Sequence, residues 1–236
     1  NKNDYMNLKN IFENCNLKIK KVLLKNFAEG SYISNNNLKI DTFFKIEIGE
    51  IESQIFYFEN DSLKYEQNFN FGTDLIIKDI SKVTSLRINV VKKIISQNQF
   101  SKETGTDEIV EKELFENENF RKVKKKLVFE IAAARIQELA EVIIFRNINI
   151  TNSLKKTNLL FLDVSDKANL KCFDKSYSLS FSNNNSIDVK LIESINTDDF
   201  LSHINKLVHF GWKKEAIPVT STKKSLIAKF FHALFS

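Results

Sequence analysis

Residue types that commonly do chemistry are sparse and widely spaced in this sequence. Its two cysteines, Cys15 and Cys172, form no Cys-x-x-Cys pair, so neither a disulfide scaffold nor a cysteine zinc site is indicated. The three histidines, His203, His209 and His232, lie late in the chain, and none stands in a His-Glu-x-x-His spacing. We therefore expect no catalytic residue and no metal site.

The end of the sequence has the pattern of an amphipathic helix that lies on a membrane. On a helical wheel of about 100° per residue, six large apolar side chains of residues 223–236 fall in one half. The helix is basic, aromatic-rich and too short to span a bilayer. The residues expected to bind lipid are Lys223, Lys224, Leu226, Ile227, Phe230, Phe231, Leu234 and Phe235. The alternative is that this helix packs onto its own domain, but the polar stretch 212–222 argues against that.

A basic segment precedes the apolar stripe of a second, longer helix. It contains five cations within six positions, namely Arg121, Lys122, Lys124, Lys125 and Lys126. One interpretation is a solvated helix start, with an i,i+3 ion pair between Arg135 and Glu138 further along the helix. The other is a docking surface for an acidic peptide, in which Arg135 offers a bidentate fork to carboxylates. The residues alone favour the solvated start, because runs of charge are usually solvated faces.

The composition limits the class of protein. The chain has 236 residues, 42% hydrophobic and 28% charged, which allows one sizeable core or two small ones and excludes intrinsic disorder. No apolar run is long enough for a transmembrane helix. The net charge of +5 is spread along the chain without an aromatic–basic signature, so we expect no nucleic-acid partner. The abundance of Phe and the scarcity of Gly favour an AT-rich coding sequence, and the initial Asn favours part of a longer protein.

The pattern of apolar residues predicts a mixed α/β order. We expect helices over 5–16, 74–97, 121–146 and 197–210. We expect strands over 18–24, 43–49, 53–58, 63–70 and 159–164, of which the run 43–70 forms an antiparallel meander. Loops or irregular structure are expected at 35–37 and 98–119, and short strands with turns at 166–190.

The order of these pieces resembles the C-terminal half of FtsA, the actin-like bacterial cell-division protein. The segment KIEIGEIESQIFYFENDSLKYEQNFNFGTDLIIKDIS is similar to the family's second phosphate-loop strand pair followed by its "GG..iT.DI" motif. Gly72 and Asp79 stand at matching positions of that motif. Arg135 and Glu138 match an "R..E" pair on the long helix, and the final segment matches the membrane-targeting helix.

The resemblance implies an α/β fold, the C-terminal half of an actin-like ATPase (ribonuclease-H-like) fold with a C-terminal amphipathic helix. The implied parts are an inner subdomain of residues 1–81 and 156–195, an outer inserted subdomain of residues 82–155, a return helix over 196–211, a linker over 212–222 and the membrane helix over 223–236.

The sequence departs from the family where nucleotide phosphates would bind. The glycine-rich phosphate loop is replaced by Gly49-Glu50-Ile51-Glu52, which adds bulk and negative charge close to a polyphosphate. The remnants of the nucleotide site are Glu47, Gly49, Ser53, Gly72 and Asp79. We therefore expect neither ATP nor Mg²⁺ as a cofactor, no ATPase activity, and Gly49 as an ordinary turn glycine.

The function that the resemblance implies is a cell-division adaptor without a chemical step. It would tether the C-terminal peptide of FtsZ, the tubulin-like division protein, through Lys124, Arg135 and Glu138, and help to recruit the divisome. It would lie on the cytoplasmic side of the inner membrane at the septum, bound to anionic lipid, with self-association and later division proteins as further partners. The alternatives are an actin-like ATPase, a pilus-assembly scaffold of the PilM type, and a soluble interaction domain with a packed final helix.

Overall fold

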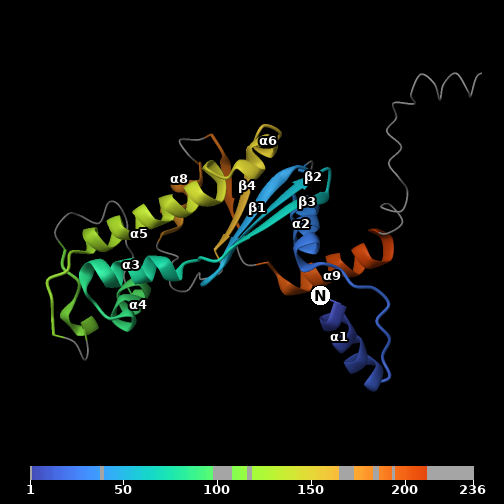
Figure 1. The fold of residues 1–236 in the computed structure, drawn as a ribbon, viewed down its shortest axis with the longest axis horizontal. Coiled ribbons are helices and arrows are strands. Elements are labelled where there is room, and N and C mark those ends of the chain that lie inside the picture. Colours follow the sequence, from blue (N-terminus) through green and yellow to red (C-terminus); the bar gives the residue numbers. More distant parts are fainter. Residues whose placement is uncertain are drawn as a thin grey trace, which may run out of the picture. The chain divides into compact units, whose positions relative to one another are not determined.

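The computed structural model describes residues 2–37, 40–97, 108–115, 119–164, 173–182, 186–192 and 195–211 (Figure 1). The predicted linker and the predicted membrane helix, residues 212–236, lie outside the described residues. The chain divides into two compact units, one of Asn1–Tyr32 with Asn196–Ser236 and one of Ile33–Ile195. The predicted division into inner and outer subdomains stays a prediction.

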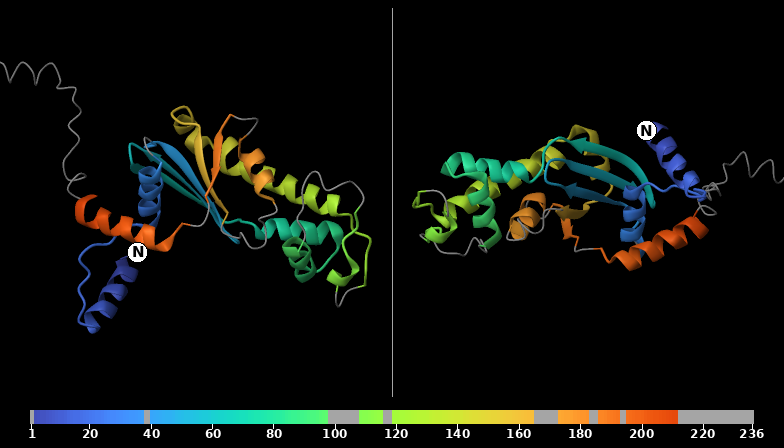
Figure 2. Two further views of the ribbon diagram at one scale, coloured as in Figure 1. Left: turned by 180° about the vertical axis from the view of Figure 1, so that it is seen from behind. Right: turned by 90° about the horizontal axis from the view of Figure 1, so that it is seen from below.

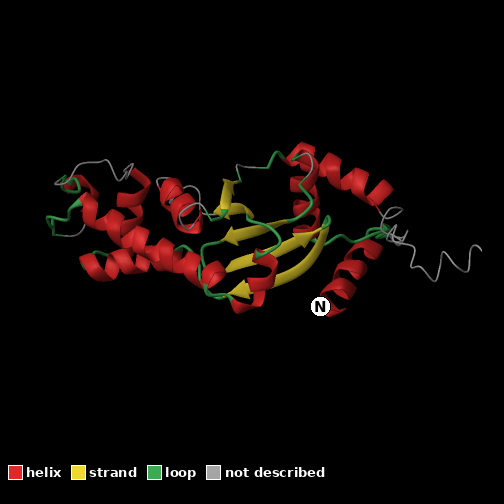
Figure 3. Ribbon diagram, turned by 90° about the horizontal axis from the view of Figure 1, so that it is seen from above, coloured by secondary structure: helices red, strands yellow, loops and turns green. Residues whose placement is uncertain are grey.

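The unit Ile33–Ile195 is built on one five-stranded sheet (Figure 3). Its strands are β1 (Phe43–Ile48), β2 (Ser53–Glu59), β3 (Ser62–Phe69), β4 (Leu159–Val164) and β5 (Asp188–Leu191). The spatial order is β3-β2-β1-β4-β5, with β1, β2 and β3 antiparallel and β4 and β5 parallel to β1. The predicted meander and the predicted strand 159–164 are thus confirmed.

Both hairpins of the meander have short turns. Between β2 and β3, Asn60 and Asp61 have φ values of 52° and 60°. Two consecutive positive φ values are those of a type I′ turn, whose twist matches that of paired strands and which Asn and Asp tolerate well. The turn between β1 and β2 is formed by residues 49–52, and the register pairs Ile48 with Ser53.

Helices connect β3 to β4 and β4 to β5. They are α3 (Asp74–Thr84), α4 (Ile88–Gln97), the 3-10 turn η1 (Lys112–Phe115), α5 (Lys125–Ala140), its π-helical continuation η2 (Glu141–Phe145), η3 (Ile148–Ile150), α6 (Thr151–Leu154) and α8 (Asp174–Ser182). The predicted helix 74–97 is therefore two helices. It breaks at Ser85, which has φ 57° and accepts a hydrogen bond from Arg121 Nη1 at 2.7 Å.

The alternation of side chains along β1 gives the sheet two apolar faces. Phe44, Ile46 and Ile48 belong to the larger core, together with buried side chains of α3, α5 and α8, and Figure 2 shows α3 continuing beyond one end of the sheet. Phe43, on the other face, packs in a smaller cluster with Phe56, Phe58, Phe161 and Ile33, the last from α2 (Lys25–Asn36). A strand that is apolar on both faces is typical of the centre of a sheet.

The other unit contains α1 (Lys2–Asn14), the first part of α2, α9 (Thr197–Lys206) and the π-helical turn η5 (Leu207–Gly211). Within it, α2 contacts α9. The ring of Tyr32 lies edge-on to Phe200 and to His203, each at 5.6 Å between centroids, and His203 Nε2 lies 3.1 Å from Ser31 Oγ. Burial against this contact lowers the pKa of His203, with Lys206 as a second cause.

Several sequence predictions for local structure are wrong. Residues 18–24 form no strand, because no segment among the described residues pairs with them. The helix α2 was not predicted, since its Gly, Ser and Asn content hides the buried face that stabilises it. The region 166–190 was expected to form short strands with turns; its end belongs to β5, but Asp174–Ser182 form the helix α8. The long helix begins at Lys125, not at Arg121, and Val142, expected in its apolar stripe, is exposed.

The centre of the sheet should dominate stability. Ile46→Ala removes a fully buried side chain from the central strand, between β2 and β4, so the free energy of unfolding should fall by about 3 kcal/mol. Urea denaturation followed by circular dichroism measures this. The matched control is Ile148→Ala, at a side chain that is 85% exposed, which should change stability by about 0.5 kcal/mol or less. Equal losses in both proteins would contradict the assignment of the core.

Candidate functional site

The residues matched to a phosphate-binding loop form a tight turn between β1 and β2. Gly49 N–H donates to the carbonyl oxygen of Glu52 at 2.9 Å, which closes the turn on itself. Gly49 has no positive φ, and a Cβ there would lie 2.8 Å from the same oxygen. Glycine is therefore needed for space, and Gly49 is a turn glycine as expected.

The turn is attached to the first residues of α3. The N–H groups of Thr73 and Asp74 donate to the carbonyl oxygens of Gly49 and Glu50, at 2.9 and 3.0 Å. The next two N–H groups, of Leu75 and Ile76, donate to carbonyl oxygens within the same helix start. The first turn of a helix is a ready anion site only while its N–H groups are open. Here main-chain oxygens already accept from all four.

The approach of Gly72 to the turn explains why a glycine stands at this position. A Cβ on Gly72 would lie 2.2 Å from the carbonyl oxygen of Gly49 and 2.7 Å from that of Glu50. Ser53, which is fully buried, adds a further link, because its Oγ donates to the carbonyl oxygen of Phe71 at 2.8 Å. The predicted site residues Gly49, Ser53 and Gly72 thus lie together, where the β1–β2 turn is joined to the main chain at the start of α3.

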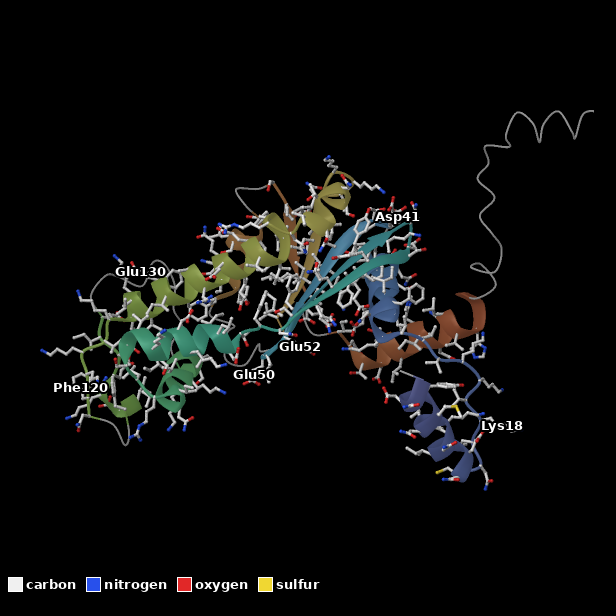
Figure 4. The ribbon with its side chains drawn as sticks, in the orientation of Figure 1. Lys18, Asp41, Glu50, Glu52, Phe120 and Glu130 are labelled. Carbon is white, nitrogen blue, oxygen red and sulfur yellow. The ribbon has the colours of Figure 1, made fainter. Side chains whose placement is uncertain are left out.

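The side chains of the turn are unsuited to phosphate. Glu50, Ile51 and Glu52 are all exposed, and Ile51 is 71% exposed. Figure 4 shows the two carboxylates where the β1–β2 turn meets the start of α3. Glu50 Oε1 lies 3.4 Å from Lys92 Nζ of α4. A polyphosphate at this turn would meet two carboxylates and an isoleucine, so the residues present do not fit ATP.

Glu47, the first of the matched residues, binds a lysine of its own strand. The Nζ of Lys45, which is fully buried, donates to Glu47 Oε1 and also lies 5.5 Å from the ring centre of Phe56. Lys45 was not singled out from the sequence. A lysine inside an otherwise apolar central strand is the signal that could have found it, because a buried ammonium needs an acceptor.

Asp79 does not lie at the turn but pairs with Arg135, a residue predicted for a different site. Arg135 Nε donates to Asp79 Oδ2, and Arg135 Nη1 lies 2.7 Å from Glu138 Oε2. The hydrogen bond to Asp79 is the main cause that raises the pKa of Arg135. The i,i+3 pair of Arg135 with Glu138 is formed, and the guanidinium serves to join α5 to α3.

The basic segment considered for peptide docking lies before and at the start of α5. Lys124 is extended and forms a bridge with Ile109, while Lys125 lies near Glu111 and Glu108, at 2.7 and 3.2 Å. The hydrogen bond to Glu111 is the main cause that raises the pKa of Lys125. Lys126 pairs weakly with Glu130 at 3.8 Å. The exposed aromatic side chain in this region is Phe120 (Figure 4).

The remaining predictions concern lipid binding, metal binding and membrane-spanning helices. The eight predicted lipid-binding residues, Lys223 to Phe235, lie outside the described residues. Within the described ranges, no group of three or more His, Cys, Asp or Glu side chains could hold a metal ion. None of the described helices has the length and apolar character needed to cross a bilayer.

Solved structures identify the architecture. MreB5 of Spiroplasma citri bound to ADP is similar over 90% of this chain and 66% of its own, with 12% identity and a TM-score of 0.52. The fold is actin-like. EutJ from Carboxydothermus hydrogenoformans (11% identity, 70% of this chain, 46% of its own, TM-score 0.46) is also similar. A chain of the PilM–PilN type IV pilus biogenesis complex is similar as well (10% identity, 79% of this chain, 49% of its own, TM-score 0.45).

The similarity is one of fold. The chain spans about half the length of EutJ and of the PilM–PilN chain. No family model matches the sequence, and no curated protein matches it. The prediction of an α/β, actin-like fold is thus confirmed, whereas the more specific resemblance to FtsA stays a hypothesis.

The contact between Gly72 and the turn should be sensitive to a single methyl group. Gly72→Ala places a Cβ against two carbonyl oxygens, so the free energy of unfolding should fall by about 1–3 kcal/mol. The amides of Thr73 and Asp74 should also exchange with solvent faster, because their acceptors move away. The control is Glu52→Ala in the same turn, expected within about 0.5 kcal/mol of the parent. Unchanged exchange in the Gly72→Ala protein would contradict the contact.

Proposed function

We propose that this protein is an actin-like adaptor of bacterial cell division that works without ATP turnover. It attaches FtsZ filaments to the cytoplasmic face of the inner membrane and helps to recruit the divisome. The observation that carries the proposal is the closed turn between β1 and β2, at the position matched to a phosphate loop. A protein that keeps an actin-like fold but fills this position with its own carbonyls and carboxylates is suited to binding other proteins.

The turn supports a scaffold because it replaces a ligand-dependent contact with a permanent one. The start of α3 binds the carbonyl oxygens of Gly49 and Glu50, so nucleotide is not needed to join the hairpin to the helix. Glu50 and Glu52 would repel the phosphates, and Ile51 would have to be displaced. The enzyme alternative, an actin-like ATPase, would need open N–H groups at the start of α3 and a turn without these carboxylates and this isoleucine.

The membrane part of the proposal is supported by the sequence of residues 223–236. Their apolar half can enter the interface, while Lys223, Lys224 and Lys229 face anionic headgroups. Each lysine near such a surface contributes about 1 kcal/mol, which suits reversible attachment. A tail of this kind favours an adaptor that binds a membrane over a soluble interaction domain.

The docking part of the proposal is supported by the surface around the basic segment. Arg135, first expected to grip the peptide, is bound by Asp79 and Glu138, so it serves better as a link between helices. Cations and exposed apolar side chains instead lie together next to the start of α5, among them Lys122, Lys126 and Phe120. An acidic peptide with apolar residues is complementary to that surface.

The absence of nucleotide binding is directly measurable. Titration of the full chain with a fluorescent ATP analogue, with Mg²⁺ present, should show no saturable signal up to millimolar concentration. The reason is the crowding and negative charge of the turn. A dissociation constant in the micromolar range, or release of phosphate above the rate in buffer, would contradict the proposal.

Tethering should depend on the tail and on the basic segment separately. The full chain should carry FtsZ filaments to the top of a density gradient with anionic vesicles, whereas a chain cut before Lys223 should leave them at the bottom. Lys122→Glu should keep vesicle binding but weaken FtsZ recruitment about fivefold, the effect of losing about 1 kcal/mol of charge attraction.

A matched control makes the test specific. Lys155→Glu has the same change of charge at an exposed position before β4, and it should recruit FtsZ like the parent. Flotation of the chain without any recruitment of FtsZ would keep the membrane role and reject FtsZ as the partner.

A further inference from the structure

The helix α1 leaves its whole apolar stripe exposed. At about 100° per residue, four of its side chains and that of the residue just after it fall within an arc of about 120°. They are Tyr5, Leu8, Ile11, Phe12 and Cys15. The exposed fractions of the four large ones run from 38% for Phe12 to 61% for Ile11, and Cys15 is exposed as well. Contiguous apolar surface of this kind on a soluble unit marks a contact that the described residues do not make.

The segment that follows α1 also exposes apolar side chains. Leu17, Val22 and Leu24 are each more than half exposed. No backbone hydrogen bond joins residues 18–23 to another segment within the described part of the chain. The stripe on α1 and this segment together expose seven large apolar side chains.

The C-terminal residues begin near this surface. Lys21 Nζ donates to the carbonyl oxygen of Val208 in η5, within the unit of Asn1–Tyr32 and Asn196–Ser236. Gly211, the last described residue, therefore lies close to the segment that leaves α1. The eleven residues 212–222 can span at most about 40 Å, and α1 is about 20 Å long. Residues 223–236 can therefore reach the stripe.

We propose that residues 223–236 pack on the α1 stripe when the protein is away from the membrane. The two surfaces are complementary, since each is an apolar stripe of about the same length. The tail approaches from the carboxyl end of α1, which puts Lys223 and Lys224 near Glu13 and near the negative end of the helix dipole. The tail then runs antiparallel to α1, with Phe230 and Phe231 over the middle of the stripe.

This proposal deepens the proposed function, because it concerns the same tail and adds its regulation. The apolar face of residues 223–236 cannot cover α1 and enter lipid at the same time. A short connection holds the tail at an effective concentration near millimolar, so even a weak contact with α1 competes with lipid. Membrane attachment is then an exchange of one apolar surface for another.

Cys15 provides a direct probe, since it lies at one end of the stripe. The test uses the full chain carrying Cys172→Ser, and measures the rate at which the Cys15 thiol reacts with Ellman's reagent in the absence of lipid. The same chain cut before Lys223 should react about five to ten times faster, because the tail no longer covers the thiol. Anionic vesicles should accelerate the reaction of the full chain to the same extent.

Two further variants separate packing from charge. Ile11→Asp places a carboxylate in the stripe, so the full chain should react as fast as the shortened one. Asn10→Asp places the same carboxylate on the opposite side of α1, and the slow rate should persist. Both positions are exposed, and circular dichroism should show unchanged helix content.

The outcomes distinguish this proposal from the proposed function. Equal rates for the full and shortened chains would overturn the docking of the tail on α1, whatever vesicle flotation shows. Flotation of the shortened chain that is lost in its Ile11→Asp form would also overturn it, because α1 itself would then bind lipid. Protection of Cys15 by a tail that never floats with vesicles would support the docking and reject the membrane role.

Discussion

The close approach of Gly72 to the turn between β1 and β2 is the constraint on which the larger unit depends. Two main-chain oxygens, of Gly49 and Glu50, accept from the first N–H groups of α3, and this is possible only because no Cβ stands at position 72. The contact fixes where α3 leaves the sheet. A helix start without a side-chain cap obtains its hydrogen bonds from a neighbouring hairpin instead.

The position of α3 then determines the helices beyond it. Asp79, in the middle of α3, holds Arg135 of α5, while Ser85, just after its end, accepts from Arg121 ahead of α5. The helix α3 is thus attached to the sheet at its start, and the α5 region is attached to α3 at its middle and just after its end. Residues that the sequence assigned to a nucleotide site and to a peptide site turn out to be partners in this support. Here the carboxylate of Asp79 and the guanidinium of Arg135 join α3 to α5.

The sequence predicted those elements whose signal is local. The meander 43–70 was predicted well, because β-branched and aromatic residues alternate with clear turn residues such as Asn60 and Asp61. The prediction from sequence failed where tertiary contacts determine the secondary structure. The run 18–24 has the composition of a strand, yet a strand needs a neighbour, and α2 is a helix only because Ala28 and Ile33 are buried.

The candidate site was predictable to the same degree. Gly49, Ser53 and Gly72 could be grouped from the motif, because a hairpin and the loop after its third strand meet at one end of a sheet. The pairing of Asp79 with Arg135 could not, since the two residues are 56 positions apart and nothing local joins them. The negative charge of Glu50 and Glu52 is evident from the sequence. That the turn carrying them is closed by its own backbone is visible only in the structure.

The closed β1–β2 turn and the exposed stripe on α1 both bear on how the protein could be regulated. Where a bound nucleotide organises an actin-like domain, its phosphates supply charge that the protein must balance; here the hairpin and α3 are joined without a ligand. In the proposed function, a scaffold of this kind would be regulated through surfaces that are exchanged between partners. The stripe on α1 would suit this role, because its apolar side chains are exposed within the described chain and would be stabilised by burial against an apolar partner. Regulation of this protein would then follow from competition for apolar surface.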